Sequence, residues 1–139
     1  MPVVIAIDFG LLRTGLAISD TQQIIATPLK TVMSKDLMTE LTGLIKKHAI
    51  KEVVIGYPLN LNSKDTDMTQ NVRYLKEIIE KTFSSICVHL QDERFTSKIA
   101  SQTISKLGTN KQKKNKKLID QVSATIILQD FLNRKNSIL

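Results

Sequence analysis

The chain has 139 residues, which is enough for one domain with a hydrophobic core, and 42% of them are hydrophobic, which excludes a disordered protein. No stretch approaches the roughly 20 apolar residues that span a bilayer, so we expect no membrane association. The net charge is +7, and the single cysteine, Cys87, excludes an internal disulfide. We therefore predict a cytoplasmic protein with a single domain over residues 1–139, in which Cys87 is a buried, small hydrophobic residue.

Five segments have the composition of β-strands. Val3–Phe9 is apolar on both faces, and Leu16–Ser19 and Ile24–Thr31 follow it after tight turns, which predicts antiparallel hairpins. Glu52–Tyr57 and Ile86–Gln91 are β-branched runs that come later in the chain and are separated by helical patterns. These two strands should therefore be parallel neighbours in the same sheet.

Four segments have helical spacing. Leu residues predict a helix over Lys35–His48, and a second helix should begin after Thr66 or Asp67. A third is expected over Lys98–Lys106, and a final helix over Leu118–Arg134. The element order predicts an α/β fold with one mixed five-stranded sheet, an antiparallel meander plus parallel strands, and helices packed on it.

The positive charge is confined to the last third of the chain. Residues 1–93 have ten Lys/Arg and eleven Asp/Glu, whereas residues 94–139 have ten Lys/Arg and only two acids. This distribution indicates either a solvated loop or an arm that binds nucleic-acid phosphates. The densest stretch contains five lysines: Lys111, Lys113, Lys114, Lys116 and Lys117.

Acids occupy positions where an unpartnered carboxylate would be costly. Asp8 ends the first apolar strand, Asp92 and Glu93 end the last, and Asp120 lies on the apolar stripe of the final helix. Asp120 could instead complement the helix dipole. Together, however, Asp8, Asp120 and one acid of the Asp92–Glu93 pair could form a cage for a hard divalent cation such as Mg²⁺ or Mn²⁺. No cluster of His or Cys suggests zinc.

Four segments, in order along nearly the whole chain, resemble the motifs of the YqgF/RuvX family. The first is Ile7-Asp-Phe-Gly-Leu-Leu-Arg-Thr-Gly-Leu-Ala-Ile-Ser-Asp20, and the second is Val54-Ile-Gly-Tyr-Pro-Leu-Asn60. The third is Asp92-Glu-Arg-Phe-Thr96, and the last runs from Lys117-Leu-Ile-Asp120 into Ile127-Leu-Gln-Asp-Phe-Leu132. The loop after Asn60 lacks the glycines usual in the family, which leaves its substrate contacts open.

The resemblance implies a ribonuclease H-like fold and a catalytic, metal-binding triad of Asp8, Glu93 and Asp120. Adjacent strand residues face opposite ways, so only one of Asp92 and Glu93 can face Asp8, and the family pattern favours Glu93. We expect Arg13 or Arg94 to hold the scissile phosphate, and the lysines at 111–117 to bind flanking phosphates.

The function that the resemblance implies is a hydrolase acting on ester bonds, a metal-dependent nuclease. Its substrate would be structured RNA, with the 5′ end of precursor 16S rRNA processed during ribosome biogenesis. Association with the ribosome-assembly machinery is a further expectation. One alternative is a Holliday junction resolvase-like endonuclease that cuts branched DNA by the same metal chemistry. A second is a nucleic-acid-binding module with an idle site.

Overall fold

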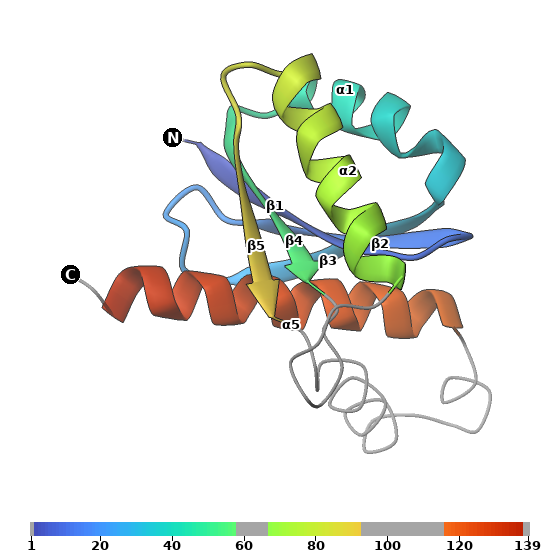
Figure 1. Ribbon diagram of the computed structural model, residues 1–139. Coiled ribbons are helices and arrows are strands. Elements are labelled where there is room, and N and C mark those ends of the chain that lie inside the picture. The colour runs from blue at the N-terminus through green and yellow to red at the C-terminus, as the bar shows by residue number, and fades with distance from the viewer. Residues whose placement is uncertain (1, 58–66, 93–115, 138–139) are drawn as a thin grey trace.

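In the computed structural model, which describes residues 2–57, 67–92 and 116–137, five strands form one sheet in the order β3-β2-β1-β4-β5 (Figure 1). The central strand is β1, which is antiparallel to β2 and parallel to β4. The meander continues from β2 to an antiparallel β3, and β5 is parallel to β4. The mixed sheet predicted from the sequence is therefore confirmed. The strands are β1 Val3–Phe9, β2 Arg13–Ser19, β3 Ala26–Met33, β4 Ile50–Tyr57 and β5 Cys87–Asp92.

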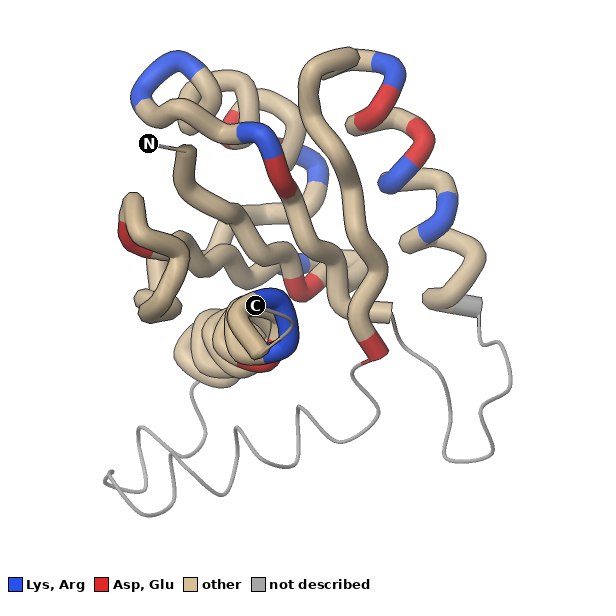
Figure 2. The backbone as a smooth tube through the Cα atoms, turned by 90° about the vertical axis from the view of Figure 1, so that its left-hand side faces the viewer, with Lys and Arg blue, Asp and Glu red and all other residues tan. Residues whose placement is uncertain are grey.

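Helices cover both faces of the sheet. A short 3-10 helix, Ser34–Asp36, leads into α1 (Leu37–Lys47), and α1 and α2 (Asp67–Thr82) pack on one face. Helix α5 (Lys116–Ser137) crosses the opposite face, and Figure 2 shows it nearly along its axis. Among the described residues, no helix is long and apolar enough to cross a membrane.

The two faces of the sheet carry separate hydrophobic clusters. Odd-numbered residues of β1, such as Ile5 and Ile7, belong to the cluster under α1 and α2. Even-numbered residues, Val4 and Ala6, belong to the cluster under α5. This alternation follows from the two-residue period of a strand. It also determines on which face of the sheet each polar side chain at a strand end lies.

The observed elements differ from the predicted ones mainly at their ends. β2 begins at Arg13 rather than Leu16, because Arg13 pairs with Met33 and the hairpin is longer than its apolar pattern. Ile24 and Ile25, expected in β3, are 51% and 60% exposed and lie in the preceding turn. The helix predicted over Lys98–Lys106 lies outside the described residues.

The prediction that Cys87 is buried is wrong. Cys87 is exposed, whereas its neighbour Val88 is buried in the cluster under α1 and α2. β5 is the edge strand of the sheet, and Cys87, next to Val88, faces the opposite side from the cluster under α1 and α2. An apolar run indicates a strand, but it does not indicate whether that strand ends up at the edge of the sheet.

The turn between β2 and β3 is held by Asp20. Its carboxylate accepts hydrogen bonds from the backbone N–H groups of Ile24 at 2.7 Å, Ile25 at 2.8 Å and Gln22 at 3.3 Å. These bonds, with the one from Ile25 contributing most, lower the pKa of Asp20 below its ordinary value.

The lowered pKa predicts a pH-dependent contribution of Asp20 to stability. A carboxylate whose pKa is depressed by folding stabilises the protein above its unfolded pKa, and this contribution is lost as pH falls through the folded pKa. Asp20→Asn should therefore destabilise the protein at neutral pH, and the difference from the wild type should shrink as the solution is acidified. Urea unfolding of both proteins across this range measures the difference, and a pH-independent difference would contradict the assignment.

Candidate active site

Asp8 lies at the carboxyl end of the central strand, and its side chain is on the same face of β1 as those of Val4 and Ala6. It therefore faces α5, on the same side as the cluster that contains those two residues. Asp8 is half-buried, and its partner in the antiparallel ladder is Gly15 of β2. The strand thus presents this carboxylate at the edge of the core, beneath the beginning of α5.

Asp120 is brought to the same place by a close contact between α5 and β2. A Cβ atom built on Gly15 would lie 2.1 Å from the backbone oxygen of Asp120 and 2.4 Å from its carbonyl carbon. Only a residue without a side chain allows this approach, so Gly15 fixes where α5 crosses the sheet. Because Gly15 is the ladder partner of Asp8, the fold brings together two of the three predicted acids.

The close approach, rather than unusual backbone dihedrals, explains the glycines of the first motif. No glycine among the described residues has a positive φ. Gly10 is constrained in the same way as Gly15, since an added Cβ would lie 2.5 Å from the backbone oxygen of Arg13.

Arg13 completes the described part of the site. Its Nε donates a hydrogen bond to Oδ2 of Asp120 at 3.3 Å, and the two side chains are 25% and 24% exposed. The residues are 107 positions apart, so the pairing could not be read from local sequence. The structure therefore places a guanidinium directly at one of the predicted metal ligands.

Asp92 ends β5 but faces away from this cluster. It pairs in register with Tyr57 and is in phase with Val88, which packs under α1 and α2. The residues of β5 that alternate with Val88 and Asp92 face α5, because the ring centroid of His89 lies 5.0 Å from that of Phe131 in α5. Asp92 is thus on the wrong face to join Asp8.

Several predicted site residues lie outside the described part of the chain or have no described side chain. Lys116 and Lys117 are the first two residues of α5, and only their backbone is described. The others lie outside the described residues: Glu93, Arg94, Lys111, Lys113 and Lys114.

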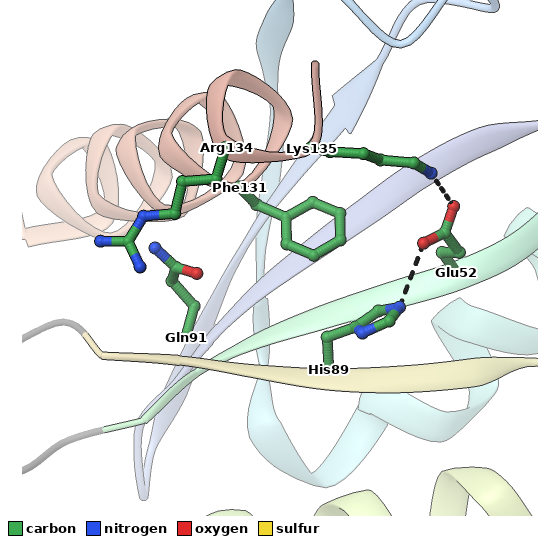
Figure 3. A pocket seen from close by; sticks show the side chains of 6 residues that line it. All are labelled: Glu52, His89, Gln91, Phe131, Arg134 and Lys135. Carbon is green, nitrogen blue, oxygen red and sulfur yellow. Dashed lines mark hydrogen bonds and ion pairs between the residues drawn. The ribbon is translucent and has the colours of Figure 1, made fainter. Parts of the chain in front are cut away.

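A groove on the same face lies between β4, β5 and the second half of α5 (Figure 3). The carboxylate of Glu52 bonds Nε2 of His89 at 3.1 Å and also pairs with Lys135. Lys135 in turn donates to Oε1 of Gln23 at 2.7 Å, which ties the end of α5 to the β2–β3 turn. These contacts agree with a structural role for His89. The cavity has a volume of about 390 Å³ and is lined by Glu52, His89, Gln91, Phe131, Arg134 and Lys135.

The sequence model of one family, described as "RuvX: Holliday junction resolvase", matches residues 2–134. The chain belongs to the RuvX family. Relatives in this family include a protein of Bacteroides fragilis, 38% identical over 136 residues that cover 97% of this chain and 99% of the relative. A protein of Flavobacterium psychrophilum is 40% identical over 136 residues, with coverage of 97% and 99%. Both are named "Putative pre-16S rRNA nuclease".

Solved structures with a similar fold include Holliday junction resolvases. RuvC of T. thermophilus, in complex with Holliday junction substrate, superposes with a TM-score of 0.58 at 12% identity and covers 98% of this RuvX chain and 96% of its own. Fowlpox virus resolvase with Holliday junction DNA gives 0.57 at 13% identity, with coverage of 96% and 98%. At such low identity the similarity concerns the fold alone, and it confirms the predicted ribonuclease H-like architecture.

Proposed function

We propose that this RuvX protein is a metal-dependent nuclease that hydrolyses phosphodiesters of structured RNA, with the 5′ end of precursor 16S rRNA as its substrate in the cytoplasm. The observation that carries the proposal is the meeting of Asp8 and Asp120 at Gly15, on the face of the sheet under α5. Two acids from opposite ends of the chain have no evident structural need to meet at the rim of a hydrophobic core. The RNA substrate is suggested by the names of the relatives.

The donor set suits a hard divalent cation. Carboxylate oxygens are the ligands that Mg²⁺ and Mn²⁺ prefer, and the site offers them from a strand and a helix whose backbones are in contact. The guanidinium of Arg13 at Asp120 supports this fit, because a positive group is already accommodated beside that carboxylate. Bound divalent ions would supply an activated water and neutralise charge on the leaving oxygen.

Glu93 is the third ligand in this proposal. The alternation along β5 puts His89 and Gln91 on the α5 face and Asp92 on the other, and the next position in phase with His89 and Gln91 is 93. This argument from strand period supports the family pattern, which also favours Glu93 over Asp92. Asp8, Glu93 and Asp120 would then ligate the metal from the end of β1, from the residue that follows β5 on the far side of β4, and from helix α5.

Basic residues would hold the substrate phosphates. Arg13 contacts Asp120, and its planar guanidinium can donate two parallel hydrogen bonds to two oxygens of one phosphate. Arg94 follows Glu93 directly and would reach the same phosphate. The lysines at 111–117, which lead into α5 close to Asp120, would attract the flanking backbone.

The decisive experiment presents the purified protein with precursor 16S rRNA and with four-way DNA junctions in parallel, with Mg²⁺ or Mn²⁺ and with a chelator. We expect metal-dependent cleavage of the RNA. Cleavage of the junction alone would favour the resolvase activity that the family description names. Binding of either polymer without cleavage would favour the binding module and contradict the proposed nuclease.

The lysine stretch gives a second testable expectation. Replacing Lys113, Lys114, Lys116 and Lys117 by Gln should lower the slope of log affinity against log salt by about 3–4, because each neutralised phosphate contributes about 0.9. Fluorescence anisotropy with duplex RNA at several salt concentrations measures this slope.

A matched control removes the same charge from the opposite side of the molecule. Lys46, Lys47, Lys51 and Lys81 are exposed on the α1 and α2 side of the sheet, the face opposite to the one that α5 covers. Their replacement by Gln should leave the slope nearly unchanged. Equal effects of the two quadruple variants would mean that net charge, and not the lysine stretch, sets the affinity.

A further inference from the structure

Arg13 and a metal ion would compete for the same carboxylate. Asp120 is a proposed metal ligand, and its Oδ2 accepts a hydrogen bond from Nε of Arg13. Arg13 is also proposed to hold the substrate phosphate. One side chain thus has two alternative anionic partners, and the ligand state of Asp120 decides which of them is available.

The contact between Arg13 and Asp120 has the geometry of a pair that exchanges readily. Its length of 3.3 Å exceeds the roughly 2.7–2.9 Å typical of charged N–H···O bonds. About a quarter of each side chain is exposed to solvent, which screens the pair. The contact uses Nε alone, whereas a guanidinium binds most strongly through two parallel N–H groups.

The backbone on both sides of Arg13 is held in place. Ser34 donates its N–H to the carbonyl of Leu12 at 2.9 Å and its hydroxyl to the carbonyl of Gly10 at 2.6 Å. The hydroxyl of Ser34 also lies 2.8 Å from that of Thr14. Asp120 is fixed in turn by the contact of its backbone with Gly15. A change of partner would therefore need no movement of the backbone at Arg13 or Asp120.

We propose that Arg13 is an electrostatic placeholder: it neutralises Asp120 while the site lacks metal, and it turns to the substrate phosphate when Asp120 becomes a metal ligand. This inference rests on the proposed metal-dependent function and adds the order of events to it. Capture of phosphate by Arg13 is then coupled to metal loading, so the metal-free protein would engage the scissile phosphate weakly. By linkage, phosphate bound to Arg13 would also favour metal binding.

The side-chain signal of Arg13 can test the exchange directly. The chain has only four arginines, so ¹⁵N-labelled arginine gives four Nε–H resonances, and Arg13→Gln identifies one of them. Mg²⁺ alone should shift this resonance and speed its exchange with water. The resonance of Arg134, which pairs with Asp130 at 3.2 Å further along α5, should not move. Inorganic phosphate should shift the Arg13 resonance strongly with Mg²⁺ present and weakly without it.

Calorimetric titration with Mn²⁺ alone provides the second measurement. Arg13→Gln should bind the ion about two- to five-fold more tightly than the wild type, the range expected when a partly exposed ion pair no longer competes. Arg13→Lys keeps the charge and should lie near the wild type. Arg134→Gln removes the Arg134–Asp130 pair of α5 and should bind like the wild type.

The outcomes separate this inference from the proposed function. An Arg13 resonance that stays unmoved at saturating metal, or unchanged metal affinity in Arg13→Gln, would overturn the placeholder role while leaving a metal site in place. Failure of every variant, and of the wild type, to bind either ion would overturn the metal-dependent function and the placeholder role together.

Discussion

Replacing Asp8 by Asn is expected to abolish metal-dependent cleavage without unfolding the protein. Asp8 lies near the end of the central strand of the sheet, beside the contact between Gly15 and Asp120, and its carboxylate is a proposed metal ligand. Asn keeps the size of the side chain and removes its charge. Loss of metal-based stabilisation of the transition state, several kcal/mol, corresponds to a rate decrease of about 10³-fold or more. Single-turnover cleavage of precursor RNA measures the rate.

Stability and binding distinguish a chemical effect from a structural one. Asp8→Asn should unfold in urea at the same concentration as the wild type or a higher one, because one of two neighbouring acids has lost its charge. RNA binding in the presence of a chelator should be retained. Asp36→Asn is the matched control: Asp36 is exposed before α1, makes no capping bond to that helix through its side chain, and should leave cleavage unchanged. Full activity of Asp8→Asn would remove Asp8 from the active site.

The fold was largely predictable from the sequence because its rules are local. The apolar run Val3–Phe9 is observed with those bounds, and tight turns or intervening helices set the antiparallel and parallel neighbours. Strand ends were less predictable, since Arg13 joins β2 only through its pairing with Met33. The exposure of Cys87 depends on the edge position of β5, which no residue near Cys87 encodes.

The site was predictable as a set of acids but not as a geometry. Strand period was enough to place Asp8 on one face, and helical period put Asp120 on the face that packs on the sheet. Their meeting at Gly15 depends on where α5 crosses β2, a contact between segments more than 100 residues apart. For the same reason the pair of Arg13 and Asp120 had no signal in the sequence, although both residues were candidates on other grounds.

Gly15→Ala is expected to damage both stability and activity, because the added methyl group has no free space. It would lie 2.1 Å from the backbone oxygen of Asp120, and backbone atoms cannot move aside as a flexible side chain can. Helix α5 must therefore shift away from β2, and Ala124 and Ile127, both buried in the cluster under α5, shift with it. Overpacking of this kind costs about 3 kcal/mol, the upper part of its usual range. Urea unfolding measures this loss.

The same shift carries Asp120 away from Asp8, so cleavage should fall even where Gly15→Ala remains folded. A displacement of about 1 Å in a catalytic group can reduce the rate about 10²-fold. Gly43→Ala is the matched control, since Gly43 lies within α1 and an added Cβ would meet nothing within 4 Å. It should stabilise the protein by up to about 1 kcal/mol through helix propensity and leave cleavage unchanged. Wild-type stability in Gly15→Ala would show that α5 does not rest on β2 at this point, and the two acids would then lose the contact that brings them together.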